Sequence, residues 1–210
     1  MRKGVLIVIS GFSGAGKGTI TKKLLENYDN YALSISMTTR QPRPGEVDGR
    51  EYFFVDRERF EQHIADEALV EYAEYVGNYY GTPRAYVEEQ LDNGKDVILE
   101  IEIQGALKIK ERFPDTLLLF VSTKSADVLF ERLTGRATET EEVIRNRMMR
   151  AAEEAEGMNE YEYIIINDDL DVCVKETHSI IQSAKAAAMR NEEFIKNIQQ
   201  ELKDLSKGEK

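Results

Sequence analysis

The feature that most constrains the fold of this chain is a glycine-rich loop between an apolar run and a predicted helix. Residues 5–9 are apolar and mostly β-branched, which is typical of a strand buried on both faces of a parallel sheet. Glycines let backbone N–H groups wrap an anion, and the start of the next helix, expected over residues 19–28, adds its dipole. The pattern therefore predicts a phosphate site made by Gly11, Phe12, Ser13, Gly14, Ala15, Gly16, Lys17, Gly18 and Thr19.

The lysine of this loop strengthens the phosphate interpretation. Lys17 offers a point charge for the outer phosphates of a nucleotide, and its spacing from Gly11 is that of the Walker A loop. The next residue is Gly18 rather than the Ser or Thr of the strict consensus, and a hydroxyl follows one position later, at Thr19. A flexible glycine turn is the alternative, but strand, loop, lysine and helix come in the expected order. The motif predicts a nucleoside triphosphate site without indicating the reaction.

The rest of the chain favours an α/β fold, with a P-loop core whose parallel sheet is flanked by helices. Apolar runs typical of buried strands alternate with segments of helical periodicity. Residues 34–96 interrupt this alternation and predict an inserted small mixed sheet with its own helices. Residues 33–39 predict a short strand, and the further expected elements are core strands at residues 97–103, 116–121 and 163–166 and helices at residues 106–112, 126–133 and 141–155.

The last part of the chain predicts one long charged helix from Ser179 onward. Its apolar residues recur at helical spacing and form a stripe along one side. Such a stripe could pack on the core or on a second subunit, so a monomer and a homodimer both stay open. The stripe consists of Phe194, Ile195, Ile198, Leu202 and Leu205.

Composition excludes several classes of function. The chain has 28 Lys and Arg against 39 Asp and Glu, a formal net charge of −11, and a field of that sign repels nucleic acid and anionic membranes. One cysteine, Cys173, excludes an intramolecular disulfide and a cysteine-based zinc site. The apolar runs are far shorter than the ~20 residues of a membrane span, and the first leads directly into the loop instead of a signal-peptide cleavage site. We expect a cytoplasmic protein without nucleic-acid or membrane partners.

Several blocks beyond the loop resemble the guanylate kinase family, and the likeness runs from about residue 6 to residue 174. The resemblance implies transfer of the γ-phosphoryl group of ATP to GMP, giving ADP and GDP, with Mg²⁺ as cofactor, in guanine nucleotide recycling and GTP and dGTP supply. It also implies a core of residues 1–33, 97–123 and 157–210, a GMP-binding domain of residues 34–96 and a lid of residues 124–156. The matching blocks are residues 36–46, 49–54, 71–73, 77–82, 100–106, 135–141 and 166–170.

Two arginines and two tyrosines are candidates for the phosphate of GMP. Arg40 and Arg43 flank a turn three residues apart, where two guanidinium groups can grip a dianionic phosphate through charge-assisted hydrogen bonds. Tyr52 and Tyr80 can each add a phenolic donor. The family resemblance places all four on the GMP phosphate. Solvated turn arginines and core tyrosines are the alternative.

Glu71 is the candidate for reading guanine. Guanine presents N1–H and an exocyclic N2 amine side by side, and one carboxylate can accept from both. Adenine has an acceptor at N1, so the same carboxylate would stay unpaired, which is costly in a buried site. Ser36 and Thr82 could serve the O6 side of the base. A surface charge without a role is the alternative for Glu71.

Two acids lie within the second predicted core strand. Glu100 and Glu102 are two residues apart, so on a strand both would point to one face, near the carboxyl end where open α/β sheets bind ligands. Glu100 resembles a Walker B acid that acts on Mg²⁺ through water, and the resemblance puts Glu102 near GMP. The family more often has Asp at that place, which leaves a direct contact of Glu102 with GMP open. A structural ion pair is the alternative for either acid.

The resemblance also implies residues that act on the transferring phosphoryl group. Arginines that close on this group stabilise the charge spread over its oxygens. The resemblance favours Arg136 and Arg147 and supports Arg132 less, so the predicted catalytic residues are Lys17, Arg40, Arg136 and Arg147. Asn167 resembles the family's contact to the donor adenine, with a turn role as the alternative. We interpret Arg145 and Arg150 as solvated helix charges.

Two rival functions are compatible with parts of the pattern. One is a non-catalytic module that binds phosphopeptides through the acceptor pocket, but such modules typically have a degraded glycine loop. The other is a kinase of the same class with AMP or UMP as acceptor, against which Glu71 and Ser36 argue. Measuring ADP release from ATP with GMP, dGMP, AMP and UMP separates these readings.

Overall fold

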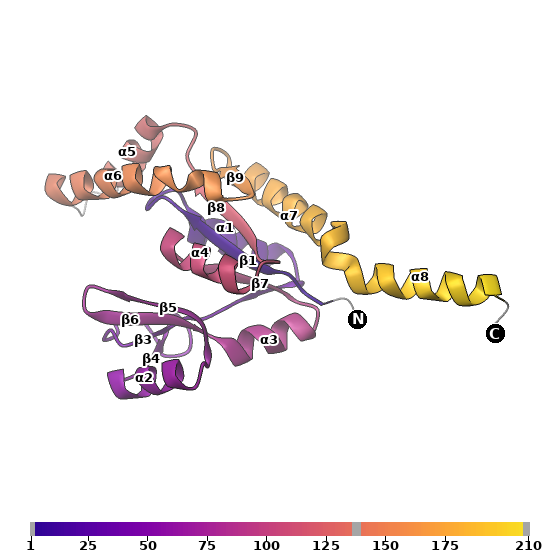
Figure 1. Ribbon diagram of the computed structural model, residues 1–210. Coiled ribbons are helices and arrows are strands. Elements are labelled where there is room, and N and C mark those ends of the chain that lie inside the picture. Colours follow the sequence, from indigo (N-terminus) through magenta and orange to yellow (C-terminus); the bar gives the residue numbers. More distant parts are fainter. Residues whose placement is uncertain (1–2, 136–139, 208–210) are drawn as a thin grey trace.

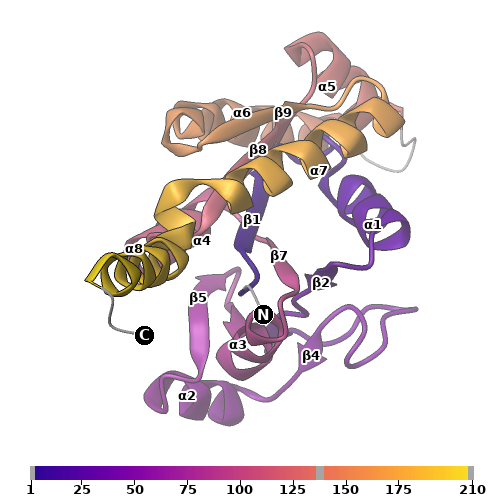
Figure 2. The same ribbon diagram turned by 90° about the vertical axis from the view of Figure 1, so that its right-hand side faces the viewer.

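A parallel sheet of five strands places the glycine-rich loop at the end of its middle strand. The computed structural model describes residues 3–135 and 140–207, and the strand order is β2-β7-β1-β8-β9 (Figures 1 and 2). The middle strands are almost fully buried, which their continuous apolar runs favour. The five strands are β1 (Leu6–Gly11), β2 (Tyr31–Leu33), β7 (Asp96–Glu100), β8 (Leu117–Ser122) and β9 (Tyr163–Ile166).

Helices flank this sheet. Figure 2 shows α1 and α7 on one side of the sheet and α4 on the other, and α1 packs directly against α7. Three of the helices beside this sheet begin at a side chain that accepts a hydrogen bond from the first turn: Ser125 caps α5, Thr140 caps α6 and Asp169 caps α7. The helices are α1 (Lys17–Asn27), α4 (Ile103–Arg112), α5 (Ala126–Thr134), α6 (Glu141–Glu156) and α7 (Leu170–Ala186).

A second, mixed sheet lies beside the first, with the strand order β4-β3-β6-β5. β3 is parallel to β4 and antiparallel to β6, and β5 and β6 form an antiparallel hairpin. This sheet has a small core of its own, made by Met37, Phe60 and Leu69, and α4 of the larger unit packs against β5. Its elements are β3 (Met37–Thr38), β4 (Phe53–Phe54), α2 (Arg57–Ala65), β5 (Leu69–Tyr75), β6 (Asn78–Pro83) and α3 (Arg84–Asp92).

The structure confirms the predicted α/β fold with a parallel core sheet and a separate mixed sheet, and it corrects two predicted strands. The strand expected at residues 33–39 is two strands in different sheets, because β2 ends at Leu33 and the chain crosses to the second sheet before β3 begins at Met37. The strand expected at residues 97–103 ends at Glu100. Glu102 has extended backbone angles and is the N-cap of α4, so this helix starts three residues before the predicted position.

The predicted single C-terminal helix is also wrong, because it is two helices that meet at a break. α7 begins at Leu170, and Ala187, with φ −58° and ψ 141°, ends it. A short 3₁₀ turn, η2 (Ala188–Asn191), then leads to α8 (Glu192–Lys207). The Asn191 amide donates to the carbonyl of Lys185 at 3.2 Å, so a carbonyl in the last turn of α7 finds a partner outside the helix.

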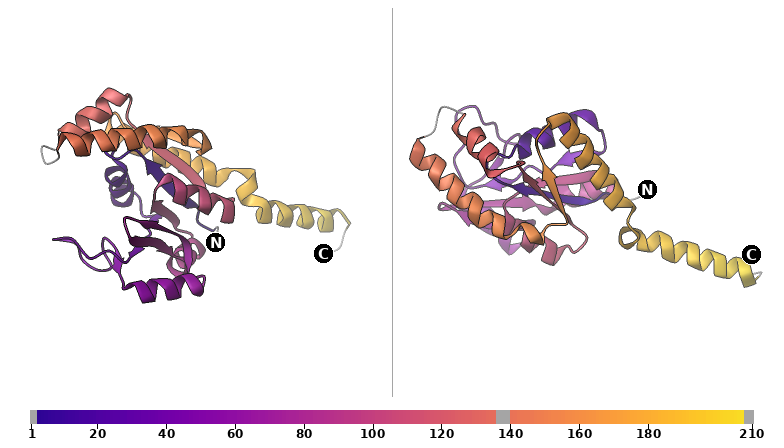
Figure 3. Two further views of the ribbon diagram at one scale, coloured as in Figure 1. Left: turned by 60° about the vertical axis from the view of Figure 1, so that its left-hand side comes forward. Right: turned by 90° about the horizontal axis from the view of Figure 1, so that it is seen from above.

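α8 extends away from the rest of the molecule (Figures 1 and 3). Its apolar stripe stays exposed, with Phe194 67% and Leu202 59% exposed. Packing of the stripe on the core, one of the two possibilities left open by the sequence, is therefore not what the structure shows for residues 192–207. Among the described residues, no helix combines the length and apolar character that crossing a membrane requires.

A buried carboxylate joins α7 to the amino end of the parallel strands, at the end of the sheet opposite the glycine-rich loop. Asp96, at the start of β7, is 0% exposed. It accepts hydrogen bonds from the Val5 N–H at 2.9 Å, the Asn30 amide at 2.9 Å and the Lys185 ammonium at 2.7 Å. Three donors offset the cost of burying one charge, and they tie α7, β1 and the loop before β2 to one residue.

We predict that Lys185→Ala destabilises the protein, because it leaves the Asp96 carboxylate buried without its cation. Removing one partner of a buried ion pair costs roughly 3 kcal/mol. Urea unfolding measures the change, and Lys175→Ala, at an exposed position of the same helix, is the control. Equal stability of the two variants would contradict the role given to Lys185.

Candidate active site

The glycine-rich loop needs glycine at positions that later parts of the chain approach closely. Gly14 and Gly16 have φ values of 93° and 97°, which residues other than glycine rarely adopt. A Cβ atom on Gly16 would lie 2.4 Å from Nδ2 of Asn167, and one on Gly14 would lie 2.9 Å from Cδ2 of Leu133. The loop can take this shape only without side chains at these two positions.

Asn167 connects the end of β9 to the loop. Its side chain is 6% exposed, and its amide donates to the Ala15 carbonyl at 2.8 Å. Arg132 on α5 adds to this connection, because its guanidinium donates to the Asn167 carbonyl at 2.8 Å and to the Ala15 carbonyl at 3.4 Å. A pocket of about 340 Å³ opens beside these contacts, lined by Gly14, Gly16, Thr19, Arg132, Asn167, Asp168 and Leu170.

Lys17 is the first residue of α1, and its ammonium folds back over the loop. Nζ donates to the carbonyls of Gly11 at 2.5 Å and Phe12 at 3.2 Å. Burial lowers the pKa of Lys17, and the carboxylates of Glu154, Glu100 and Glu102 oppose this effect. The ammonium is thus held by backbone oxygens, which carry no net charge and can be exchanged for phosphate oxygens.

Glu100 lies at the carboxyl end of β7, next to the start of α1. A Cβ atom on Gly18 would lie 3.6 Å from Oε2 of Glu100. The strict Walker A consensus has a Ser or Thr at this place, so its hydroxyl would point toward the space that this carboxylate borders. A carboxylate beside a phosphate-binding loop suits Mg²⁺, which takes few protein ligands and completes its shell with water and phosphate. Among the described residues, no group of three or more His, Cys, Asp or Glu forms a metal cluster.

Glu102 does not share the strand of Glu100, contrary to the expectation that both acids point to one face. Its carboxylate pairs with Arg150 of α6 at 2.6 Å, and Arg150 also lies 3.3 Å from Glu154. Arg150 is therefore not the solvated helix charge that the sequence suggested. Burial raises the pKa of Glu154, while Arg150 and Lys17 oppose that rise.

Arg40 lies beside Tyr52, one of the two tyrosines predicted to bind phosphate at the second sheet. Its guanidinium makes two hydrogen bonds of 3.0 Å to the carboxylate of Glu46, and this neighbour holds the pKa of Glu46 below its usual range. The Arg40 guanidinium lies 5.4 Å from the Tyr52 ring centre, and the Tyr52 and Tyr80 rings meet edge to face at 6.0 Å. The Arg43 backbone N–H also donates to Glu46, at 2.7 Å.

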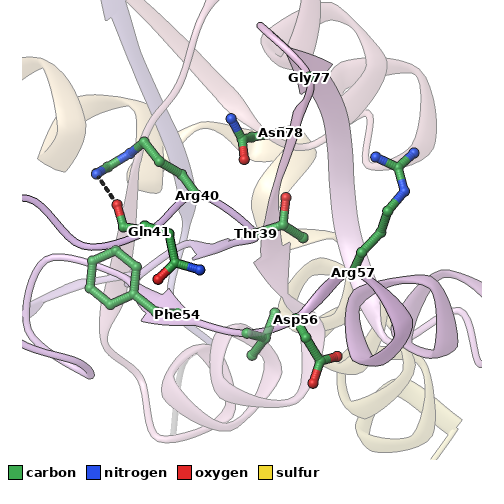
Figure 4. A pocket seen from close by; sticks show the side chains of 9 residues that line it. Thr39, Arg40, Gln41, Phe54, Asp56, Arg57, Gly77 and Asn78 are labelled. Atoms are coloured by element: carbon green, nitrogen blue, oxygen red, sulfur yellow. Dashed lines mark hydrogen bonds between the residues drawn. The ribbon is translucent and has the colours of Figure 1, made fainter.

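A pocket of about 410 Å³ lies on this sheet beside Arg40. Figure 4 shows the Arg40 guanidinium at its rim, donating to the Gln41 carbonyl, and Arg57 on the opposite side. Of the predicted acceptor residues, which all lie in the described part of the chain, only Arg40 lines this pocket. The lining consists of Thr39, Arg40, Gln41, Phe54, Val55, Asp56, Arg57, Gly77 and Asn78.

Glu71 is buried where the second sheet meets the core. It is 7% exposed, and its Oε1 accepts a hydrogen bond from the Thr82 hydroxyl at 2.8 Å. Burial raises the pKa of Glu71. Gly105 of α4 lies against the other oxygen, since a Cβ atom there would be 3.4 Å from Oε2. Ser36, half-buried just before β3, accepts from the Phe53 N–H through its carbonyl at 2.9 Å.

Of the remaining predicted arginines, only Arg147 lies in the described part of the chain. Arg147 is half-buried on α6, one turn before Arg150. Arg136 lies outside the described residues. The structure thus brings Lys17, Glu100 and Asn167 together around the loop, and it brings Arg40, Tyr52 and Tyr80 together on the second sheet.

Sequence reasoning missed four residues of this arrangement: Glu46, Gly105, Arg150 and Glu154. The positions of Arg150 and Glu154 on one helix, four residues apart, were the available signal for their ion pair. Glu46 follows the proline-glycine turn after Arg43, where a carboxylate can return to the preceding chain. Gly105 carried no signal, because its role depends on a contact between two sheets.

Comparison with known proteins agrees with this geometry. The family model described as guanylate kinase matches residues 3–184. A guanylate kinase from Oceanobacillus iheyensis is 48% identical over 202 residues, which cover 96% of this chain and 97% of the relative. A guanylate kinase from Halalkalibacterium halodurans is 53% identical over 179 residues, which cover 85% of this chain and 88% of the relative.

Solved structures point the same way. The crystal structure of guanylate kinase from Anaplasma phagocytophilum matches with a TM-score of 0.73 and 32% identity over 90% of each chain. The crystal structure of TT1252 from Thermus thermophilus matches with a TM-score of 0.52 and 16% identity, covering 89% of this chain and 100% of the other, and so supports the fold alone. The matched residues contain the glycine-rich loop, Arg40, Glu71 and Asn167. The chain belongs to the guanylate kinase family, whose members are nucleoside monophosphate kinases.

Proposed function

We propose that the protein transfers the γ-phosphoryl group of ATP to GMP, giving ADP and GDP, with Mg²⁺. The observation that supports the choice of acceptor most directly is the buried carboxylate of Glu71, held at one oxygen by Thr82. A buried acid needs donors, and guanine presents two adjacent ones that adenine lacks. By family membership we also propose a cytoplasmic role in guanine nucleotide recycling and the supply of GTP and dGTP.

On the donor side, the loop of residues 11–19 would hold the ATP phosphates. Backbone N–H groups and the start of α1 attract the anion, and the Lys17 ammonium would exchange its two carbonyl contacts for phosphate oxygens. The pocket lined by Arg132 and Asn167 would take the adenosine. The hydrogen bond from Asn167 to Ala15 supports this assignment, because it couples the pocket to the loop.

On the acceptor side, Arg40, Arg43, Tyr52 and Tyr80 would bind the GMP phosphate. The phosphate dianion of GMP would compete with Glu46 for the guanidinium of Arg40. Glu46 already orients this guanidinium through two hydrogen bonds. Ser36 and Thr82 would serve the base beside Glu71. We assign Glu102 to GMP only indirectly, because its carboxylate is engaged with Arg150.

Phosphoryl transfer would depend on alignment and charge, without a general base. Lys17, Arg40, Arg136 and Arg147 would surround the transferring group and stabilise the charge on its oxygens. We also propose that residues 34–96 form the acceptor domain, that residues 124–156 form a lid and that both close over a core of residues 1–33, 97–123 and 157–210. Closure would exclude water and prevent hydrolysis of ATP.

The residues beside the loop fit Mg²⁺, and Glu100 would hold the ion through water. The closeness of its carboxylate to Gly18 supports this, because in the strict Walker A loop the residue at this position carries a hydroxyl that binds Mg²⁺. When bound, Mg²⁺ neutralises charge on the donor phosphates. Glu100 would orient the water ligands of the ion and would keep a negative charge beside the start of α1.

We predict that ADP release from ATP requires GMP or dGMP and is much slower with AMP and UMP. Lys17→Ala should lower the rate with GMP by about 10²–10³-fold, as expected when a preorganised donor to the developing charge is removed. Thermal unfolding should be nearly unchanged, since the hydrogen bonds of the ammonium go to two loop carbonyls, which water can satisfy in its place. Near-normal turnover of Lys17→Ala, or equal use of all four acceptors, would refute the proposed reaction.

We predict that Glu71→Gln lowers kcat/KM for GMP while preserving shape. The amide can accept only part of the donor pair, and loss of a charge-assisted contact costs roughly 1.5–3 kcal/mol, about one to two decades in rate. Activity with AMP should not fall in parallel, and the KM for ATP should stay constant. Equal losses with GMP and AMP would show that guanine is read elsewhere.

The same residue predicts a pH dependence. Glu71 must be ionised to accept from guanine, and burial raises its pKa. As pH falls, the carboxyl therefore protonates earlier than an ordinary glutamate, and the KM for GMP should rise earlier. Glu71→Gln should abolish this rise, so the pH profiles of the two proteins can be compared directly.

We predict that Gly105→Val weakens GMP binding, because its side chain enters the space beside Oε2 of Glu71. The KM for GMP should rise roughly tenfold, about 1.4 kcal/mol, and the KM for ATP should not change. Gly105→Ala should have a smaller effect. Gln104→Val, at the exposed neighbouring position of α4, controls for the cost of a β-branched residue in a helix. An equal GMP effect in Gln104→Val would assign the change to the helix.

A further inference from the structure

Arg150 of α6 pairs with two carboxylates, Glu102 at the start of α4 and Glu154 on its own helix. Its Nη2 lies 2.6 Å from Oε2 of Glu102, and its Nε lies 3.3 Å from Oε1 of Glu154, one turn later on α6. The two acids differ in environment, since the Glu102 side chain is 63% exposed and the Glu154 side chain only 19%. Glu154 is thus the acid that most needs a nearby cation.

A second cation, Lys17, acts on the half-buried Glu154. Burial lowers the pKa of Lys17 and the like charge of Arg150 also lowers it; among the carboxylates that oppose this, Glu154 has the largest effect, ahead of Glu100 and Glu102. Lys17 and Arg150 both favour the ionised form of Glu154. Arg150 touches the carboxylate directly, whereas the hydrogen bonds of the Lys17 ammonium go to the carbonyls of Gly11 and Phe12.

This arrangement matters for an anionic ligand. In a site shielded from water, Coulomb interactions between unit charges are several times stronger than in bulk solvent. Without Arg150, the negative charge of Glu154 would be compensated chiefly by Lys17, and the same charge would repel incoming phosphates. Either effect reduces what the ammonium can contribute to phosphate binding.

We propose that Arg150 is a positioning residue of the donor site, which holds the Glu154 carboxylate on α6 and so leaves the Lys17 ammonium available for the donor phosphates. The inference rests on the proposed function only for its donor half, the binding of a nucleoside triphosphate at the loop of residues 11–19. It does not depend on which acceptor the protein uses.

The test is the affinity of the full-length protein for a non-hydrolysable ATP analogue with Mg²⁺ and no acceptor, measured by calorimetry. Omitting the acceptor separates the donor site from any role of Glu102 toward GMP. Arg150→Ala should raise the Kd about tenfold, within the usual range of coupling between sites. The double variant Arg150→Ala/Glu154→Gln should return the Kd to within about threefold of the wild type, because the neutral amide no longer competes for Lys17.

Two controls distinguish positioning from a loss of structure. Arg145→Ala removes an exposed arginine of the same helix and should leave the Kd unchanged. The loss in Arg150→Ala should be greater at about 50 mM than at about 300 mM salt, because salt screens the repulsion. Thermal unfolding of all variants shows whether any change in affinity merely follows stability.

Three results would overturn the inference. The first is an unchanged Kd in Arg150→Ala. The second is a double variant as weak as Arg150→Ala, which would make Arg150 structural. The third is rescue by Glu102→Gln but not by Glu154→Gln, which would assign the effect to the other acid. Failure of the wild type to bind the ATP analogue would instead refute the proposed function itself.

Discussion

The phosphate loop depends on a hydrogen bond between two distant parts of the chain, from the Asn167 amide to the Ala15 carbonyl. Parallel pairing of β1 with β8 and of β8 with β9 brings the end of β9 beside the loop, and only glycine at position 16 lets the buried amide approach. Because a buried amide without a partner is costly, the contact holds both segments. Arg132 then binds the carbonyls of the same two residues and adds α5 to the assembly.

The protein is acidic overall, yet cationic side chains lie close to the site where anionic ligands would bind. With a formal net charge of −11, the long-range field of the protein repels nucleotides. Close to the site, Arg40 is held by Glu46 and Arg150 by Glu102 and Glu154, while Lys17 rests on backbone carbonyls. These contacts order the cations before a ligand arrives, which lowers the entropy that binding must remove.

The sequence was informative where one local pattern decides a structure, and less so where two patterns compete. The loop, the parallel core strands and the separate second sheet follow from glycine spacing and apolar runs, and the structure has them. The sequence analysis placed Glu102 on a strand because its apolar neighbours, Ile101 and Ile103, are compatible both with a strand and with the start of a helix. The break at Ala187 was invisible because alanine favours helix, and side chains from η2 stabilise the end of α7 there. The pairing of Arg40 with Glu46 and the contact of Gly105 with Glu71 arise from folding, so spacing could not reveal them.

The exposed stripe of α8 has a thermodynamic consequence for that segment. Most helices owe their stability to tertiary packing, and an isolated helix of this length is marginal in water. In residues 192–207, local contacts such as Glu192 with Lys196 and Gln200 with Asp204 must therefore supply most of the helical stability. The helical population of α8 is then set by a helix–coil equilibrium separate from global unfolding, so its amide hydrogens exchange with solvent far faster than those of the buried strand β1.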